Sequence, residues 1–172
     1  MDTTTSLQEQ VNTTLEQFIS EFKTVADDII NAEPKQGTWT IGQLGQHIAL
    51  GTAGVPDQKN EPANRPADKF ETSIREVFLN EKEKYDSPKF LEPEKKRYQK
   101  EELLSKLESN KELLLKIIQE KKLDELCLDE AAPGWGHLTR YEWIKLIIYH
   151  TQRHIKQLKK LKASFGLAMQ VN

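Results

Sequence analysis

The sequence predicts an all-α fold in which four long helices form a bundle. The chain of 172 residues holds eight glycines and seven prolines, too few for a β-sandwich with a turn about every ten residues. Leu, Lys, Glu, Gln and Ala favour helices and are abundant, whereas β-branched runs are scarce. Apolar residues also recur at the spacing of one helix face along several segments. Because domains contain roughly 100–200 residues, we expect a single domain over residues 1–172.

The first long helix is predicted to extend through Ile30. Its apolar stripe comprises Leu7, Val11, Leu15, Phe18, Phe22, Val25 and Ile29. The pattern stops at Pro34, and a short loop over 32–39 leads to the second helix. There Thr40 and Gln43 form a capping box, the reciprocal side-chain pairing that opens a helix. This second helix should end near Gly51 or Gly54.

A long connection is predicted between Val55 and about Tyr98, broken by prolines near both ends. In its middle, Phe70, Ile74, Val77 and Phe78 have the spacing of a short helix that lies against the main body. Connections of this length are uncommon unless they cross over the fold or contribute to a site.

The third and fourth long helices are predicted over about 99–121 and from about 139 to 163. A second capping box, Thr139 with Glu142, opens the fourth helix. The loop lengths predict an up-down-down-up bundle, with a long crossover between the second and third helices carrying the short extra helix. The first two helices should then be antiparallel neighbours, and so should the last two.

Charge and hydropathy exclude several classes of protein. A net charge of −2 gives no general nucleic-acid footprint, and no apolar run reaches the ~18 residues that span a bilayer. The segment Met1–Gln10 does not have the pattern of a secretory signal. Cys127 is the single cysteine, which excludes an internal disulfide and fits a reducing compartment. We therefore expect a cytoplasmic protein without nucleic-acid or membrane partners.

Three of the four histidines fall on apolar helix faces. His47 lies between Leu44 and Ile48, whereas His150 and His154 are one turn apart on the fourth helix. Two imidazoles one turn apart can share a cation, and a third from a facing helix completes a three-histidine metal site. The alternative is three core histidines that bond one another, water or the backbone. That alternative is costly, because every buried ring nitrogen then needs a partner.

Three segments around these histidines resemble the DinB/YfiT-like superfamily of bacterial metal-binding bundles. They are WTIGQLGQHI at 39–48, GHLTRYEWI at 136–144 and HTQRHIKQL at 150–158. The resemblance implies an up-down-down-up four-helix bundle. It also implies a metal triad of one histidine from the second helix and an HxxxH pair from the fourth, which match His47, His150 and His154.

Three protein ligands leave a coordination position for water or substrate, as catalytic sites do. A divalent transition metal is expected, with Zn or Ni first and Fe, Mn or Cu as alternatives. The resemblance implies either thiol S-transfer, with a low-molecular-weight thiol such as bacillithiol or mycothiol, or hydrolysis of a small electrophile. A non-enzymatic metal-binding or partner-binding bundle of a stress response is the competing hypothesis, and a homodimer is expected.

Other side chains are weighed as accessories. Gln157 and Arg153 could support the metal ligands or contact substrate, although a solvated face suits Arg153 better. His137 is expected to be a surface loop residue, and Trp135 either covers the site or packs. Acidic neighbours of Cys127 disfavour a thiolate, so a reactive thiol would come from a co-substrate.

Overall fold

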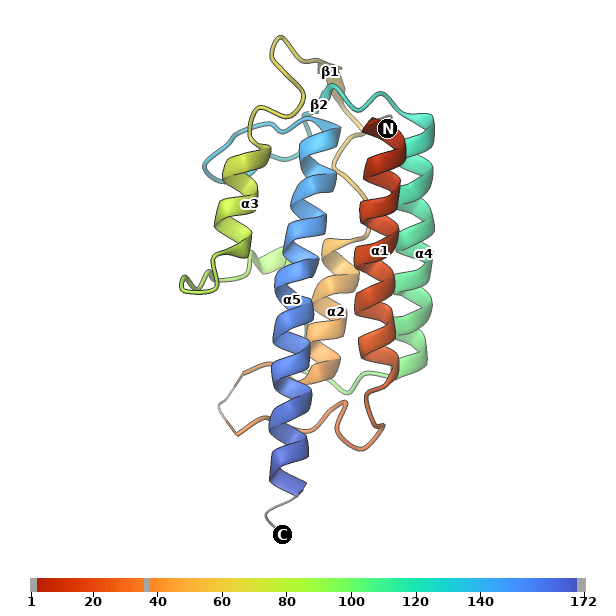
Figure 1. Cartoon of the computed structure of the whole chain (residues 1–172), viewed down its shortest axis with the longest axis vertical. Coiled ribbons are helices and arrows are strands. Elements are labelled where there is room, and N and C mark those ends of the chain that lie inside the picture. The colour runs from red at the N-terminus through yellow and green to blue at the C-terminus, as the bar shows by residue number, and fades with distance from the viewer. Residues whose placement is uncertain (1–2, 36–37, 170–172) are drawn as a thin grey trace.

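A computed structural model of the chain describes residues 3–35 and 38–169, with side chains up to residue 166. Its long helices, which lie side by side in Figure 1, are α1 (Thr3–Lys23), α2 (Ile41–Gly51), α4 (Lys100–Glu120) and α5 (Arg140–Met169). The smaller elements are α3 (Glu71–Leu79), the 3₁₀ turn η1 (Lys89–Leu91), and the strands β1 (Asn60–Pro62) and β2 (Glu125–Cys127). The protein is thus mostly helical, as predicted.

The two capping boxes form as expected. The hydroxyl of Thr40 accepts from the Gln43 amide at 3.1 Å, and the Gln43 side chain accepts from the Thr40 amide at 2.9 Å. At the start of α5, the Thr139 hydroxyl accepts from the Glu142 amide at 3.2 Å, and the Glu142 carboxylate accepts from the Thr139 amide at 2.9 Å. Both histidine-bearing helices therefore begin at a fixed residue.

The first helix is shorter than predicted, because α1 ends at Lys23. Three-residue turns come next, with amide-to-carbonyl bonds such as Ile29 to Ala26 at 3.2 Å. Val25 and Ile30 nevertheless remain buried. The spacing of apolar residues indicates which of them face the core. A run of turns can bury residues at this spacing, as a helix does. The expected loop over 32–39 is present in part, and residues 36–37 within it lie outside the described residues.

The helices that pack against one another differ from the predicted pairs. The loop lengths predict that the first two long helices, and also the last two, are direct neighbours. Instead, α1 and α2 each pack mainly against both α4 and α5. The connection between α1 and α2 is longer than predicted, because α1 ends at Lys23 and α2 begins at Ile41.

The all-α prediction needs one correction, because β1 and β2 form a small antiparallel sheet with Glu61 opposite Leu126. Three-residue strands are too short to show an alternating hydrophobic pattern, so no sequence signal predicts them. The short helix predicted around Ile74 is α3, which packs against α5 with Ile74 fully buried.

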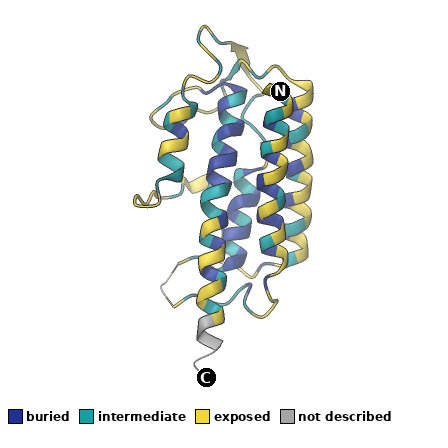
Figure 2. Ribbon diagram, viewed as in Figure 1, coloured by how far each residue is buried: buried dark blue, intermediate teal, exposed yellow. Residues whose placement is uncertain are grey.

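The interior is mostly apolar, and it also holds buried polar side chains that include His47 and His150. In Figure 2 the buried residues lie on the helix faces that look toward one another, and the outer faces are exposed. Within the described ranges, none of the helices combines the length and the apolar character needed to cross a membrane.

Candidate metal centre

The three histidines converge on one point between α2 and α5. The Nε2 atom of His47 lies 2.9 Å from Nε2 of His150 and 3.1 Å from Nε2 of His154, and the last two are also 3.1 Å apart. His47 is 3% exposed and His150 9%. The structure therefore brings together the three predicted residues, and their role as metal ligands stays a prediction.

The local sequence makes room for this convergence. Gly51 lies one turn after His47 on α2, and a Cβ atom there would lie 3.2 Å from Cε1 of His150. That separation is tighter than ordinary van der Waals contact, so glycine at this position lets the His150 ring approach α2.

Hydrogen bonds fix the tautomers of two rings. Nδ1 of His47 lies 2.8 Å from the Leu91 carbonyl oxygen, and Nδ1 of His154 lies 2.7 Å from Oε1 of Gln157. Both oxygens can only accept, so each Nδ1 carries the proton and each Nε2 presents a lone pair. The lone pairs of His47 and His154 thus meet at 3.1 Å without a hydrogen between them. A metal ion bound at this point would satisfy both lone pairs.

Burial keeps all three imidazoles neutral. It lowers the pKa of His47, and it lowers the pKa of His154 to about 3. Burial also holds the pKa of His150 well below its ordinary value, with the other two histidines and Arg153 acting in the same direction. A neutral imidazole is the form that binds a metal.

The spacing of the nitrogens fits a shared ion. Nitrogens about 2.1 Å from one ion lie about 3.0 Å apart at right angles and about 3.4 Å apart in a tetrahedron. The observed 2.9–3.1 Å matches the right-angled case. Among the described residues, the group that could hold a metal ion consists of these three histidines alone. Three protein ligands leave coordination positions open.

Sequence reasoning missed three neighbours of the imidazoles. The ring of Trp39 lies 4.8 Å from that of His47, and the ring of Phe78 meets His150 edge-on at 5.9 Å. The third is the carbonyl of Leu91, within η1. Phe78 lies on α3 and Leu91 lies in η1, and local spacing does not predict that either segment reaches the histidines.

The two predicted accessory residues take different places. Gln157 contacts His154 directly. Arg153 points to the long connection, where it donates to the carbonyls of Phe78, Asn80 and Glu83 at 3.3, 2.8 and 2.5 Å. Its charge still contributes to the lowered pKa values of His150 and His154.

The remaining candidates lie apart from the three imidazoles. His137 is exposed and contacts the Glu130 carbonyl, as expected for a loop histidine. Trp135 donates to the Ser73 hydroxyl at 2.8 Å, so it packs on α3. Cys127 is fully buried, and burial raises the pKa of its thiol to about 12. Burial raises this pKa more than the acidic neighbours do, although the sequence argument rested on those neighbours.

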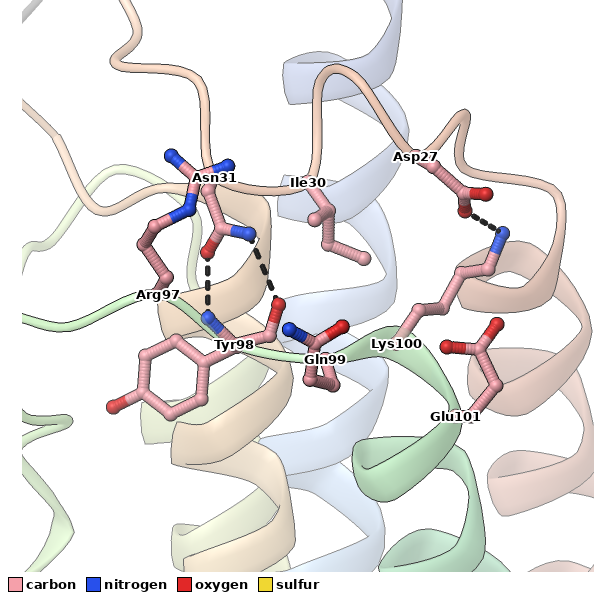
Figure 3. Close-up of a pocket in the computed structure, with 8 residues that line it drawn as sticks. All are labelled: Asp27, Ile30, Asn31, Arg97, Tyr98, Gln99, Lys100 and Glu101. Atoms are coloured by element: carbon pink, nitrogen blue, oxygen red, sulfur yellow. Dashed lines mark hydrogen bonds and ion pairs between the residues drawn. The ribbon is translucent and has the colours of Figure 1, made fainter.

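Two cavities lie elsewhere in the bundle. The cavity in Figure 3, about 190 Å³, is bordered by the turns after α1 and the start of α4. There the Asn31 side chain bonds both backbone groups of Tyr98, and Asp27 pairs with Lys100 at 2.5 Å. The second, about 320 Å³, lies beside the end of α2 and α4. None of the three histidines lines either cavity.

The chain is similar to known proteins in sequence and in fold. A Bacillus subtilis (strain 168) protein described as uncharacterized protein YuaE is 24% identical over 144 residues, which cover 83% of this chain and 89% of that protein. The crystal structure of TT2238, a four-helix bundle protein, superposes with a TM-score of 0.55 and 16% identity, covering 92% of this chain and 99% of that one. A sequence model of the DinB superfamily matches residues 10–158, most of the chain. The chain therefore belongs to the DinB superfamily.

Proposed function

We propose that the protein is a metal-dependent enzyme, a thiol S-transferase or a hydrolase, that acts on a small electrophilic substrate. His47, His150 and His154 would hold a divalent transition metal. The observation that carries the proposal is the meeting of three neutral Nε2 atoms, two of them with lone pairs fixed by their Nδ1 hydrogen bonds. Membership of the DinB superfamily supports it.

The chain's own groups would orient the ligands and shield them. The Leu91 carbonyl and Gln157 hold the His47 and His154 rings, as partners of ligating histidines do. The rings of Trp39 and Phe78 lie against the imidazoles of His47 and His150, where they would limit the access of water. When bound, a divalent ion would supply the Lewis acidity that activates a water or a thiol.

Two choices within this proposal rest on chemistry. Imidazole ligands suit Zn and Ni, with Fe, Mn and Cu as alternatives. A reacting thiol would come from a small co-substrate, because the buried Cys127 has a raised pKa and is not a nucleophile.

Metal content tests the proposal. Purified wild-type protein, reconstituted with Zn or Ni and freed of excess metal, should retain about one ion per chain. The His150→Ala variant should lose most of it, and His137→Ala, which changes an exposed loop histidine, should retain it. If wild-type protein retains no metal, the proposal is wrong.

Activity then separates the two reactions. Electrophiles presented with and without low-molecular-weight thiols should be consumed by the metal-loaded protein only. A requirement for thiol indicates S-transfer, and turnover without thiol indicates hydrolysis.

A second candidate is a non-enzymatic metal-binding bundle that serves in a stress response. The observation in its favour is the burial of His47 and His150. Tight metal retention without turnover in any thiol or hydrolysis assay would support it.

We also propose the up-down-down-up helix order with a crossover between α2 and α4. In its support, Figure 1 draws the starts of α1 and α5 at one end of the bundle and those of α2 and α4 at the other. The connection between α2 and α4 contains α3 and η1.

A further inference from the structure

The segment Asn80–Leu91, which we name the strap, follows α3 and ends with η1. Both of its ends lie near the histidines. Just before it, Phe78 packs against His150, and at its far end the Leu91 carbonyl accepts from His47. We propose that the strap closes the entrance to the three-histidine site and opens when its charged contacts with α5 are screened. The inference builds on the proposed function in one respect, that these histidines are the site to which access matters.

One contact with α5 is made by Arg153, the residue before His154. Its guanidinium donates to the carbonyls of Asn80 at 2.8 Å and Glu83 at 2.5 Å, and lies 5.6 Å from the centre of the Tyr85 ring. These contacts hold the first half of the strap against the helix that carries two of the histidines.

A second contact is a pair of salt bridges to Glu81. Lys156 and Lys160 approach its two carboxylate oxygens at 2.6 and 3.0 Å, and together they lower the pKa of Glu81 to about 2. Arg153, Lys156 and Lys160 are spaced at i, i+3 and i+7, so they form one charged row along α5. The strap therefore lies along this row.

Apart from η1, which packs against α2, the strap has few other contacts that would hold it in place. Between α3 and η1 it contains no helix or strand, and most of its residues are exposed. Its large side chains stay outside the core, with Tyr85 53% and Phe90 70% exposed. Exposed ion pairs are weak and are screened by salt, and segments with few buried contacts open most readily. These features favour opening of the strap.

Opening would also change the site itself. When the strap leaves, His47 loses the Leu91 carbonyl that fixes its proton on Nδ1. Strap closure and the metal-binding form of His47 are therefore linked, and by reciprocity an ion on the histidines favours the closed strap.

Chemical modification of the histidines by diethyl pyrocarbonate tests the strap in metal-free protein. The modification rates of His47, His150 and His154, read by peptide mass spectrometry, are divided by the rate of the exposed His137 in the same sample. In wild-type protein this ratio should rise several-fold between low and high NaCl. In Glu81→Gln it should already be high at low salt and respond little to NaCl.

Asp86→Asn is the matched control. It removes a carboxylate from the same strap that makes no salt bridge in the described part of the chain, so it should behave as wild type. The double variant Lys156→Gln/Lys160→Gln should reproduce Glu81→Gln from the other side of the pair, and circular dichroism should match wild type for all variants.

The outcomes separate the strap from the proposed function. Equal ratios for wild type, Glu81→Gln and the lysine double variant, without a salt response, overturn the strap. A salt-dependent ratio in a protein that retains no metal supports the strap and overturns only the metal site. If the protein retains metal and neither salt nor Glu81→Gln changes the ratio, the metal site is supported and the strap is overturned.

Discussion

Nδ1 of His154 lies 2.7 Å from Oε1 of Gln157, one turn further along α5. The side-chain oxygen of a glutamine can only accept, so this contact decides which nitrogen of His154 carries the proton. Nε2 is left with its lone pair directed at the other two imidazoles. A residue that touches no metal thus sets the chemical state of one that would.

Replacing Gln157 tests this relationship. Gln157→Leu removes the acceptor and should weaken metal affinity by about 10- to 100-fold. Gln157→Glu keeps an accepting oxygen and should retain most of the affinity. Competition with a chromophoric chelator measures both, and equal affinities for wild type and Gln157→Leu would contradict the assigned role.

Metal should stabilise the fold. Binding to the folded chain alone adds about 2.7 kcal/mol when free metal is 100 times the Kd. Thermal unfolding of wild type should therefore shift upward with Zn or Ni and return with excess chelator. His47→Ala should show no shift, and His137→Ala should shift as wild type does. A shift of equal size in His47→Ala would place the ion elsewhere.

Gly45 on α2 leaves room in the core for the ring of Phe22. A Cβ atom at this position would lie 2.6 and 2.7 Å from two atoms of the buried Phe22 ring. Gly45→Ala should therefore lower the free energy of unfolding by about 1–3 kcal/mol, as overpacked cores do, measured by urea denaturation. Gly166→Ala, where no atom lies within 4 Å, should be neutral or stabilising by up to about 1 kcal/mol.

Glu71 fastens α3 to α5. Its carboxylate accepts from the hydroxyls of Tyr141 and Tyr149, both at 2.8 Å, and pairs with Lys145 at 2.9 Å. Burial alone would raise the pKa of Glu71, but these donors outweigh it and lower the pKa below the ordinary 4.5. The folded state therefore favours the charged carboxylate, which stabilises the protein above pH 4.5.

Glu71→Gln should consequently cost about 1–3 kcal/mol of unfolding free energy at pH 7. The difference from wild type should shrink as the pH falls below 4.5 and through the lowered folded pKa. Urea denaturation across this pH range measures it, with the exposed Glu76→Gln on α3 as the control. A difference that does not change with pH would mean that the charge of Glu71 is irrelevant.

The features that the sequence revealed are local ones. Thr40 with Gln43 and Thr139 with Glu142 predicted both helix starts, because each capping box is formed within four residues. The HxxxH spacing placed His150 and His154 on one face for the same reason. The His47 contact was anticipated because its helix face was apolar.

The features that the sequence concealed depend on contacts between distant segments. Leu91 reaches His47 across 44 positions. Phe78 lies in the predicted short helix, but helical spacing does not show that its ring meets His150. The residues after Lys23 face the core as a helix would, so their hydrophobic spacing did not mark the end of α1. Arg153 has the sequence context of a solvated residue, and only the path of the strap shows its contacts.

The capping boxes have a consequence for how this chain can vary. The position of each histidine depends on its number of residues from the capped start of its helix. Every added residue rotates the rest of the helix by about 100° and advances it by about 1.5 Å. One insertion between Thr40 and His47 would turn the ring away from its partners, whereas insertions in the surface loops should be accommodated. The geometry of the three nitrogens therefore depends on the rotational position of each histidine along its helix, and loops that do not contact the site are free to diverge.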